Sequence, residues 1–259
     1  MRMLKTFLLS AVVGLGLASG AAQASEGHGG APKLPDHQFQ HDSVFGPIDK
    51  AAAQRGFEVY KQVCSNCHSL SLLSIRHLAG IGYDEAKIKE IAASYVVKDG
   101  PNDQGEMFDR PGLPSDRFPK PFPNTKAAAA ANNGALPPDL SLIAKARHDG
   151  EHYIYALLTG FSDAPADFKL TDGMFYNPYF PGHQIKMPPP LSEGAVTYED
   201  KTKATVEQMA HDVSTFLTYA AEPMLDARRQ LGMKVLMFFV VFGILMYATK
   251  RHLWRNVSH

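Results

Sequence analysis

The sequence predicts a mainly α protein that ends in a transmembrane helix. Two observations support this prediction. Apolar side chains recur at helical spacing in several segments of the body. Residues 231–248 then form an apolar run of 18 residues that is interrupted only by Lys234. Hydrophobic residues make up 45% of the 259 residues and charged residues 20%, a balance that excludes a disordered chain.

Charge is distributed unevenly along the chain. Residues 1–24 and 228–259 carry eight of the 26 basic side chains and none of the 26 acidic ones. Residues 25–227 therefore carry a net charge of −8. Because binding to phosphates requires clustered Lys and Arg, we expect no nucleic-acid partner.

Residues 1–24 are typical of a secretory signal peptide. Arg2 and Lys5 precede an apolar stretch at 7–17, and Ala22-Gln23-Ala24 is a small-x-small cleavage site. The alternative is a retained membrane anchor, but the stretch is much shorter than the ~20 residues that a span requires. We expect cleavage after residue 24, which leaves an exported body.

The C-terminal apolar run is long enough for a membrane span. Its 18 residues extend over about 27 Å as a helix, close to the ~30 Å hydrocarbon core. Lys234 lies near one end, where its side chain can reach the headgroups. A buried core helix is the alternative. Basic residues flank both sides and do not decide the orientation, but the signal peptide predicts a 224–250 anchor with residues 251–259 in the cytoplasm.

The two cysteines of the chain lie in the run Cys64-Ser65-Asn66-Cys67-His68. This is the attachment sequence of a c-type haem. Two thiols at this spacing can form thioethers to both vinyl groups of one haem, and the adjacent histidine reaches the iron as the proximal ligand. Export agrees with covalent haem attachment, which takes place outside the cytoplasm.

Other uses of the cysteine pair fit less well. A thioredoxin-like pair normally follows a strand in a βαβ pattern, and no such pattern surrounds it. A structural zinc site needs four ligands, and the chain has no second cysteine pair. A disulfide is the usual state of two cysteines in an exported protein, but it does not explain the adjacent histidine.

The body, 49–223, is expected to be a haem domain built from helices. Asp49 is the expected N-cap of a first helix, with Phe57, Tyr60 and Cys64 on one face. Further helices are expected at 85–97, 138–147, 151–158 and 205–221, the last with Met209 in its apolar face.

The connecting segments are expected to be irregular. Residues 25–48 are rich in Gly, Pro and His and are expected to be an extended lead-in. Residues 98–123 are rich in Pro, Gly and Asp, as in a long insertion. Pro223 is expected at the entry of the anchor helix. The core is expected to be poor in histidine, with surface positions for His28, His37, His41 and His259.

The sixth iron ligand is expected from a rigid loop. Met187 precedes Pro188-Pro189-Pro190, and these prolines can stiffen an otherwise flexible thioether. Of the other methionines, only Met107 and Met174 lie outside the signal, the anchor region and the predicted core. His183, another residue or an open site remain alternatives.

The chain resembles the cytochrome c1 family, the haem subunit of the cytochrome bc1 complex (quinol–cytochrome c reductase), in its bacterial type. The match runs through nearly the whole mature sequence and is far more specific than the haem motif alone. It rests on segments 54–57, 63–69, 117–124, 131–141, 146–148, 157–160, 176–182 and 208–223.

The resemblance implies a cytochrome c-like haem domain with long irregular insertions and one covalent haem c. It implies that Cys64 and Cys67 carry the haem and that His68 and Met187 are its axial ligands. The further haem contacts that it implies are Arg147 on a propionate, Tyr153 near it, and Pro137 or Pro138 on the His68 side. Lys186 and Pro188 depart from the small residue and the alanine that relatives tend to have around the ligand methionine. Lys186 could compete for iron only after losing its proton.

The resemblance also implies the partners. A Rieske iron–sulfur protein would be the electron donor, a soluble cytochrome c the acceptor, and cytochrome b a neighbouring subunit in a dimeric complex of a bacterial inner membrane. The haem domain would lie in the periplasm. No side chain is assigned acid–base or nucleophilic chemistry, so the chain alone is not expected to be an enzyme.

Other functions remain open at this point. One is a membrane-tethered cytochrome that serves a different oxidase or reductase, and another is a gas-sensing or peroxidase-like protein with an open sixth site. For an electron carrier, an acidic surface would attract a basic acceptor. The candidate acids lie in two groups: Asp99, Asp103, Glu106 and Asp109, and Asp163, Asp167 and Asp172.

Overall fold

The computed structural model describes residues 32–256, and the predicted signal peptide lies outside them. Within this range the protein is mainly α-helical, as the sequence predicts. The helices are α1 (Lys50–Gln62), α2 (Glu85–Ala93), α3 (Thr125–Ala131), α4 (Ile143–Ala146), α5 (Gly150–Thr159), α6 (Val206–Ala221) and α7 (Leu225–Leu253). Short 3-10 helices are η1 (Gln40–Asp42), η2 (Cys64–Asn66) and η3 (Ile75–Ile81).

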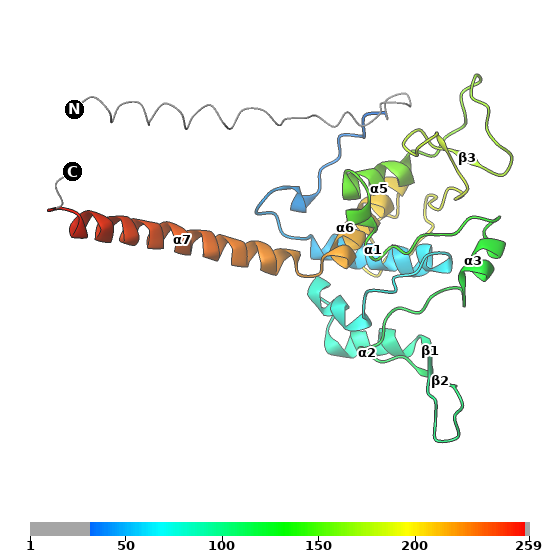
Figure 1. Ribbon diagram of the computed structural model, residues 1–259. Helices are drawn as coiled ribbons and strands as arrows, with labels where there is room; N and C mark the ends of the chain where they lie inside the picture. Colours follow the sequence, from blue (N-terminus) through cyan, green and yellow to red (C-terminus); the bar gives the residue numbers. More distant parts are fainter. Residues whose placement is uncertain (1–31, 257–259) are drawn as a thin grey trace, which may run out of the picture. The chain divides into compact units, whose positions relative to one another are not determined.

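The core lies between α1, α5 and α6, which pack side by side (Figure 1). Asp49 is the N-cap of α1 and accepts from the backbone N–H groups of Ala51 and Ala52, which confirms the predicted start. In α6 the predicted apolar face is confirmed, since Met209, Val213 and Phe216 are fully buried.

The close approach of α1 to α6 depends on a glycine. A Cβ at Gly56 would lie 1.9 Å from the carbonyl oxygen of Asp212, so no larger residue fits. Beside this contact the buried Asp212 carboxylate accepts from Nε and Nη2 of Arg55 at 2.9 and 3.0 Å. The Tyr198 hydroxyl and the Gln208 amide also donate to it, so the buried charge is paired.

Two predicted helices are shorter than expected. The helix predicted at 85–97 ends at Ala93, because Val96–Asp99 forms strand β1 and pairs antiparallel with β2, Phe108–Pro111. The segment 98–123 is therefore not wholly irregular. The helix predicted at 138–147 is reduced to α4, because the Asp139 carboxylate accepts from the backbone N–H of Ser141 and fixes a turn instead.

The lead-in is more buried than expected. Phe39 and His41 are buried, and His37 is half-buried and stacks on Tyr155 of α5 at 3.8 Å between ring centroids. The prediction of a surface position for His41 was wrong. Because His41 is the single buried histidine among the described residues, the prediction of a core poor in histidine is confirmed. Burial here comes from contacts with α5 and α6, more than a hundred residues away in sequence. His28 and His259 lie outside the described residues.

The C-terminal helix α7 is continuous from Leu225 to Leu253 (orange to red in Figure 1). It begins two residues after Pro223, which lies before the helix and not at its first position. Within residues 32–256 it alone is long and apolar enough to cross a membrane, with a mean hydropathy of 2.1 over an 18-residue window that is not buried in the protein.

Candidate functional site

Helix α1 leads directly into the cysteine motif. The helix ends at Gln62, and Cys64 begins the short helix η2. The backbone N–H groups of Cys67 and His68 both donate to the carbonyl of Cys64, at 3.1 and 2.9 Å. This tight turn brings the two cysteines and the histidine together. Both cysteines are free thiols. Cys67 is exposed and Cys64 half-buried, and burial raises the pKa of the Cys64 thiol to about 12.

The His68 ring is fixed through one nitrogen. Its Nδ1 lies 2.8 Å from the carbonyl oxygen of Pro138, which can only accept, so Nδ1 carries the hydrogen. Among the described residues Nε2 has no hydrogen-bond partner. Burial lowers the pKa of His68 and favours the neutral ring. The second nitrogen thus presents a lone pair, as in histidines that bind metals and donate through the other nitrogen.

Asp139 connects the Pro138 segment to the residues that follow His68. Its carboxylate accepts from the Ser69 hydroxyl at 2.7 Å and from the backbone N–H of Ser71 at 2.9 Å, in addition to Ser141. Burial alone would raise the pKa of Asp139, but these hydrogen bonds outweigh it and hold the pKa well below the usual value. Sequence reasoning gave Asp139 no role, because its partners lie about 70 residues away.

Tyr60 fixes the turn from its buried side. Its hydroxyl donates to the carbonyl of His68 at 3.2 Å, and the ring packs against Phe118 and Phe216. The sequence placed Tyr60 on the apolar face of the first helix, which is correct. The hydrogen bond adds a polar role that the periodicity could not indicate.

Met187 is half-buried and follows a short antiparallel pair of strands, β3 (Phe175–Tyr176) and β4 (Gln184–Ile185). The turn between these strands is fixed by His183, whose Nδ1 donates to the carbonyl of Pro178 at 2.8 Å. Lys186, beside the candidate ligand, donates from Nζ to the carbonyl of Asn133 at 3.0 Å. One nitrogen of His183 and the Lys186 ammonium are thus engaged by backbone carbonyls.

One short segment contacts both candidate axial ligand regions. Asn133 accepts from Lys186, next to Met187, and Pro138 accepts from His68. Five residue steps separate these contacts, so their backbones lie at most about 18 Å apart. Among the described residues no hydrogen bond joins the His68 side chain to Met187. The structure brings the two regions to one segment, and their roles as iron ligands stay predictions.

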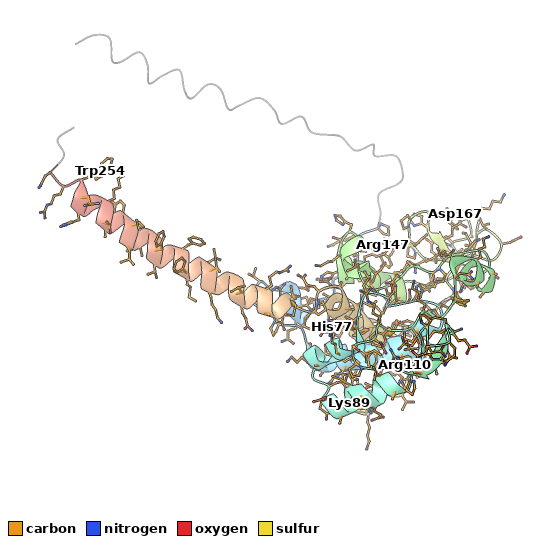
Figure 2. All side chains as sticks on the ribbon, turned by 60° about the horizontal axis from the view of Figure 1, so that its bottom comes forward. His77, Lys89, Arg110, Arg147, Asp167 and Trp254 are labelled. Atoms are coloured by element: carbon orange, nitrogen blue, oxygen red, sulfur yellow. The ribbon has the colours of Figure 1, made fainter. Side chains whose placement is uncertain are left out.

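Arg147 and Tyr153 lie close to each other at the junction of α4 and α5. Arg147 is exposed (Figure 2), and its only side-chain hydrogen bond among the described residues is to the carbonyl of Ala146. Burial raises the pKa of Tyr153, and the charge of Arg147 opposes that rise. The guanidinium therefore keeps most of its donors for an external anion. Pro137 is half-buried beside Pro138.

A cavity of about 510 Å³ lies apart from the cysteine motif. Leu158 and Thr159 of α5, Met174 and Pro189 are among its lining residues, but Cys64, Cys67, His68 and Met187 are not. Of the other two methionines that the sequence left open, Met174 thus lines a cavity, and Met107 is 56% exposed in the β1–β2 connection.

The first acidic group is partly neutralised. Arg110 (Figure 2) pairs with Asp99 across the hairpin and with Asp116 at 2.6 Å. Asp103, Glu106 and Asp109 remain exposed. Members of the second group, Asp163, Asp167 and Asp172, are exposed in the connection between α5 and β3.

A mainly α fold in which two free thiols precede a carbonyl-fixed histidine defines a protein of the c-type cytochrome class. Comparison with known proteins specifies the family, since the model of the Cytochrome C1 family matches residues 39–257. The chain therefore belongs to the cytochrome c1 family, whose members are haem-carrying electron-transfer subunits.

Three relatives illustrate the similarity. Cytochrome c1 of Rhodospirillum rubrum is 45% identical, with 98% of this chain and 99% of the relative covered. A mitochondrial cytochrome c1 heme protein of Solanum tuberosum is 49% identical over 92% and 91% of the two chains. Cytochrome b/c1 of Bradyrhizobium diazoefficiens is 46% identical over 93% of this chain, which spans only 38% of that longer protein.

Proposed function

We propose that the chain is the membrane-anchored haem subunit that passes electrons from a Rieske iron–sulfur protein to a soluble cytochrome c within a dimeric cytochrome bc1 complex, beside cytochrome b. The observation that carries the proposal is the His68 ring, which follows two free thiols and leaves Nε2 without a partner among the described residues. Membership in the cytochrome c1 family supports the choice of complex.

The residues present fit one covalently attached haem c. Cys64 and Cys67 would form its thioethers, and His68 would bind iron through Nε2 while Pro138 keeps the ring in one tautomer. Met187 would supply the opposite ligand from its Pro-stiffened loop. Arg147 would pair with a propionate, with Tyr153 beside it and Pro137 against the His68 side.

Bound haem c supplies one-electron transfer between ferrous and ferric iron. Ligation by Met and His raises the reduction potential, which suits an acceptor of electrons from a Rieske centre. The chain contributes ligands, fixed orientation and charge and makes no covalent change to a substrate. We therefore infer that it is not an enzyme on its own.

The membrane arrangement follows from the two ends of the chain. Helix α7 has the length and hydropathy of a single span. With the predicted signal peptide exporting residues 25–223, the haem domain would lie in the periplasm and residues 251–259 in the cytoplasm of a bacterium. The exposed Asp103, Glu106 and Asp109 agree with an acceptor that presents a basic surface.

Replacement of the candidate sixth ligand tests the proposal. In Met187→Leu we expect the haem to remain covalent, the long-wavelength Met–iron absorption band to disappear and the reduction potential to fall, because a strong-field ligand to ferrous iron is lost. Reduced Met187→Leu should bind carbon monoxide promptly, whereas the parent should not. Met174→Leu and Met107→Leu are the matched controls and should keep the band.

Two outcomes would contradict the proposal. An unchanged band in Met187→Leu would move the ligand to another residue. Prompt carbon monoxide binding by the native protein would favour the open sixth site of a gas-sensing or peroxidase-like protein. Purification from detergent-solubilised membranes tests the complex, since the alternative of a different oxidase or reductase predicts that cytochrome b and a Rieske protein do not copurify.

A further inference from the structure

The buried ring of His41 lacks the partners that a buried imidazole needs. Its side chain is 3% exposed, and among the residues that the structure describes neither Nδ1 nor Nε2 has a hydrogen-bond partner. The nearest charge is the Glu151 carboxylate, 3.4 Å from Nε2, which forms an ion pair only with a protonated ring. A buried polar atom without a partner costs about 1–3 kcal/mol, and an orphaned group in a native structure calls for an explanation such as an ion.

Two carboxylates face this ring from different elements. Asp42 follows His41 in η1, and Glu151 lies in the first turn of α5. One ligand atom from each of the three residues falls within 4.8 Å of the others. His41 Nε2 and Glu151 Oε1 are 3.4 Å apart. Two ligands about 2.05 Å from a tetrahedral ion are separated by about 3.4 Å, so the spacing of this ion pair also fits a zinc site.

Further contacts fix the Asp42 side chain and the His41 backbone. Asp42 receives the backbone N–H of Phe39 on Oδ2 at 2.7 Å and lies 3.1 Å from His152 Nε2 through Oδ1. The His41 carbonyl accepts from Arg229 of α7 at 3.0 Å. Such outer contacts orient metal ligands in known sites.

We propose that His41, Asp42 and Glu151 bind a Zn²⁺ ion, with the fourth position open to water. One imidazole nitrogen with two carboxylate oxygens is a ligand set that zinc accepts, whereas Ca²⁺ and Mg²⁺ prefer oxygen ligands alone. Asp42 is about one-third exposed, which leaves a path for the ion and for the water. This site is separate from the haem motif and does not depend on the proposed electron transfer.

The bound ion would connect the lead-in to the haem domain near the N-terminal end of α7. Glu151 belongs to the domain, His41 and Asp42 to the lead-in, and Arg229 contacts both His41 and Gly46 through backbone carbonyls. An ion that binds only the folded arrangement stabilises it by mass action. Zinc should therefore raise the unfolding temperature of the protein in a concentration-dependent way.

Binding is tested on the full chain in detergent with zinc chloride. After equilibrium dialysis we expect one Zn²⁺ per chain, with X-ray absorption showing nitrogen and oxygen neighbours near 2.0–2.2 Å and no sulfur near 2.3 Å. Asp42→Asn and Glu151→Gln should each weaken binding by about tenfold or more. Asp42→Asn keeps an oxygen for the Phe39 N–H, so its fold should survive. His252→Gln, exposed in the last turn of α7, should bind as the parent does.

Three results would overturn the site. One is the absence of stoichiometric binding at micromolar zinc. Another is sulfur around the ion, which would assign it to Cys64 and Cys67. The third is unchanged affinity in both carboxylate variants together with a loss in the double variant His37→Gln/His211→Gln, since that nitrogen pair, 2.8 Å apart, is the nearest competing site.

Discussion

Two histidines of this chain, His68 and His41, have opposite surroundings. His68 has one nitrogen bonded to a carbonyl and one left without a partner, and the backbone around it is tied by Asp139 and Tyr60. His41 is more deeply buried, has no hydrogen bond on either nitrogen within residues 32–256, and faces two carboxylates. The first region is organised to offer one lone pair in one direction. The second brings one imidazole and two carboxylates to within 4.8 Å of one another.

The two sites differ in whether they can be recognised from the sequence. The two cysteines that accompany His68 lie one and four residues before it, so the sequence alone identifies this site as a motif. The neighbours of His41 come from α5 and α7, more than a hundred residues later, and only the folded chain brings them together. Changes that disturb one region and spare the other can test this contrast.

The largest effect is expected from Asp139→Ala. The variant removes a carboxylate that accepts from Ser69, Ser71 and Ser141, and it leaves two backbone N–H groups without their acceptor. We expect the free energy of unfolding to fall by about 3–5 kcal/mol, because hydrogen bonds to a charged group are worth about 1.5–3 kcal/mol each and are not additive. Guanidinium denaturation in detergent measures it.

Asp109→Ala is the control for that loss, because Asp109 is exposed in the β1–β2 hairpin. We expect this variant to change the free energy of unfolding by no more than about 0.5 kcal/mol. Zinc affinity should be the same in Asp139→Ala as in the parent if the two regions are independent. A stability loss no larger than that of Asp109→Ala would mean that Asp139 does not fasten the His68 turn.

A smaller effect is expected from Tyr60→Phe. Its hydroxyl donates to the His68 carbonyl, and we expect a loss of about 1 kcal/mol in the free energy of unfolding. Tyr95→Phe is the matched control, because its ring also packs against Phe118 but its buried hydroxyl has no hydrogen-bond partner. Tyr95→Phe should therefore be neutral or stabilising. Equal changes in both variants would show that the hydrogen bond to the His68 carbonyl makes no measurable contribution to stability.

Much of the fold could be predicted from local sequence. Asp49 and Thr205 begin their helices as N-caps, and the buried positions of α6 follow the helical period. Membership in the cytochrome c1 family follows from several ordered segments and agrees with the family model. These features depend on neighbouring residues or on a span whose length is set by the bilayer.

The errors arise where distant contacts decide the structure. Val96 and Val97 continue a helical pattern, but they pair with Arg110 and Pro111 in a strand. The Asp139 carboxylate shortens a predicted helix by fixing a turn at Ser141, and it also accepts from Ser69 and Ser71, about 70 positions away. His41 was assigned to the surface because its segment is polar and rich in glycine, and its burial arises from packing against later helices.

The smallest effect is expected from the pair His37 and His211, which borders the His41 region. Burial lowers the pKa of both rings. The charges of His211 and His152 lower the pKa of His37 further, while the charge of Asp42 raises it. The pKa of His211 is lowered by burial and also by the charges of Arg55 and His41. The charges of Asp212 and Asp49 raise it. Their rings share a hydrogen bond of 2.8 Å that the neutral state allows.

The direction of the pH dependence follows from these shifts. A histidine whose pKa is lower in the folded than in the unfolded chain binds fewer protons when folded, so stability rises with pH. The stability contribution of such a histidine is full above its ordinary pKa of 6.5 and is lost as pH falls from there through the folded pKa.

We expect unfolding temperatures measured in EDTA to decline from pH 7 to 5. His37→Gln/His211→Gln should flatten that decline, and His148→Gln, 94% exposed, should not. Because both rings are only partly buried, solvent screens the effect and keeps it below that of Tyr60→Phe. A decline of unchanged slope in the double variant would assign the pH dependence to other groups.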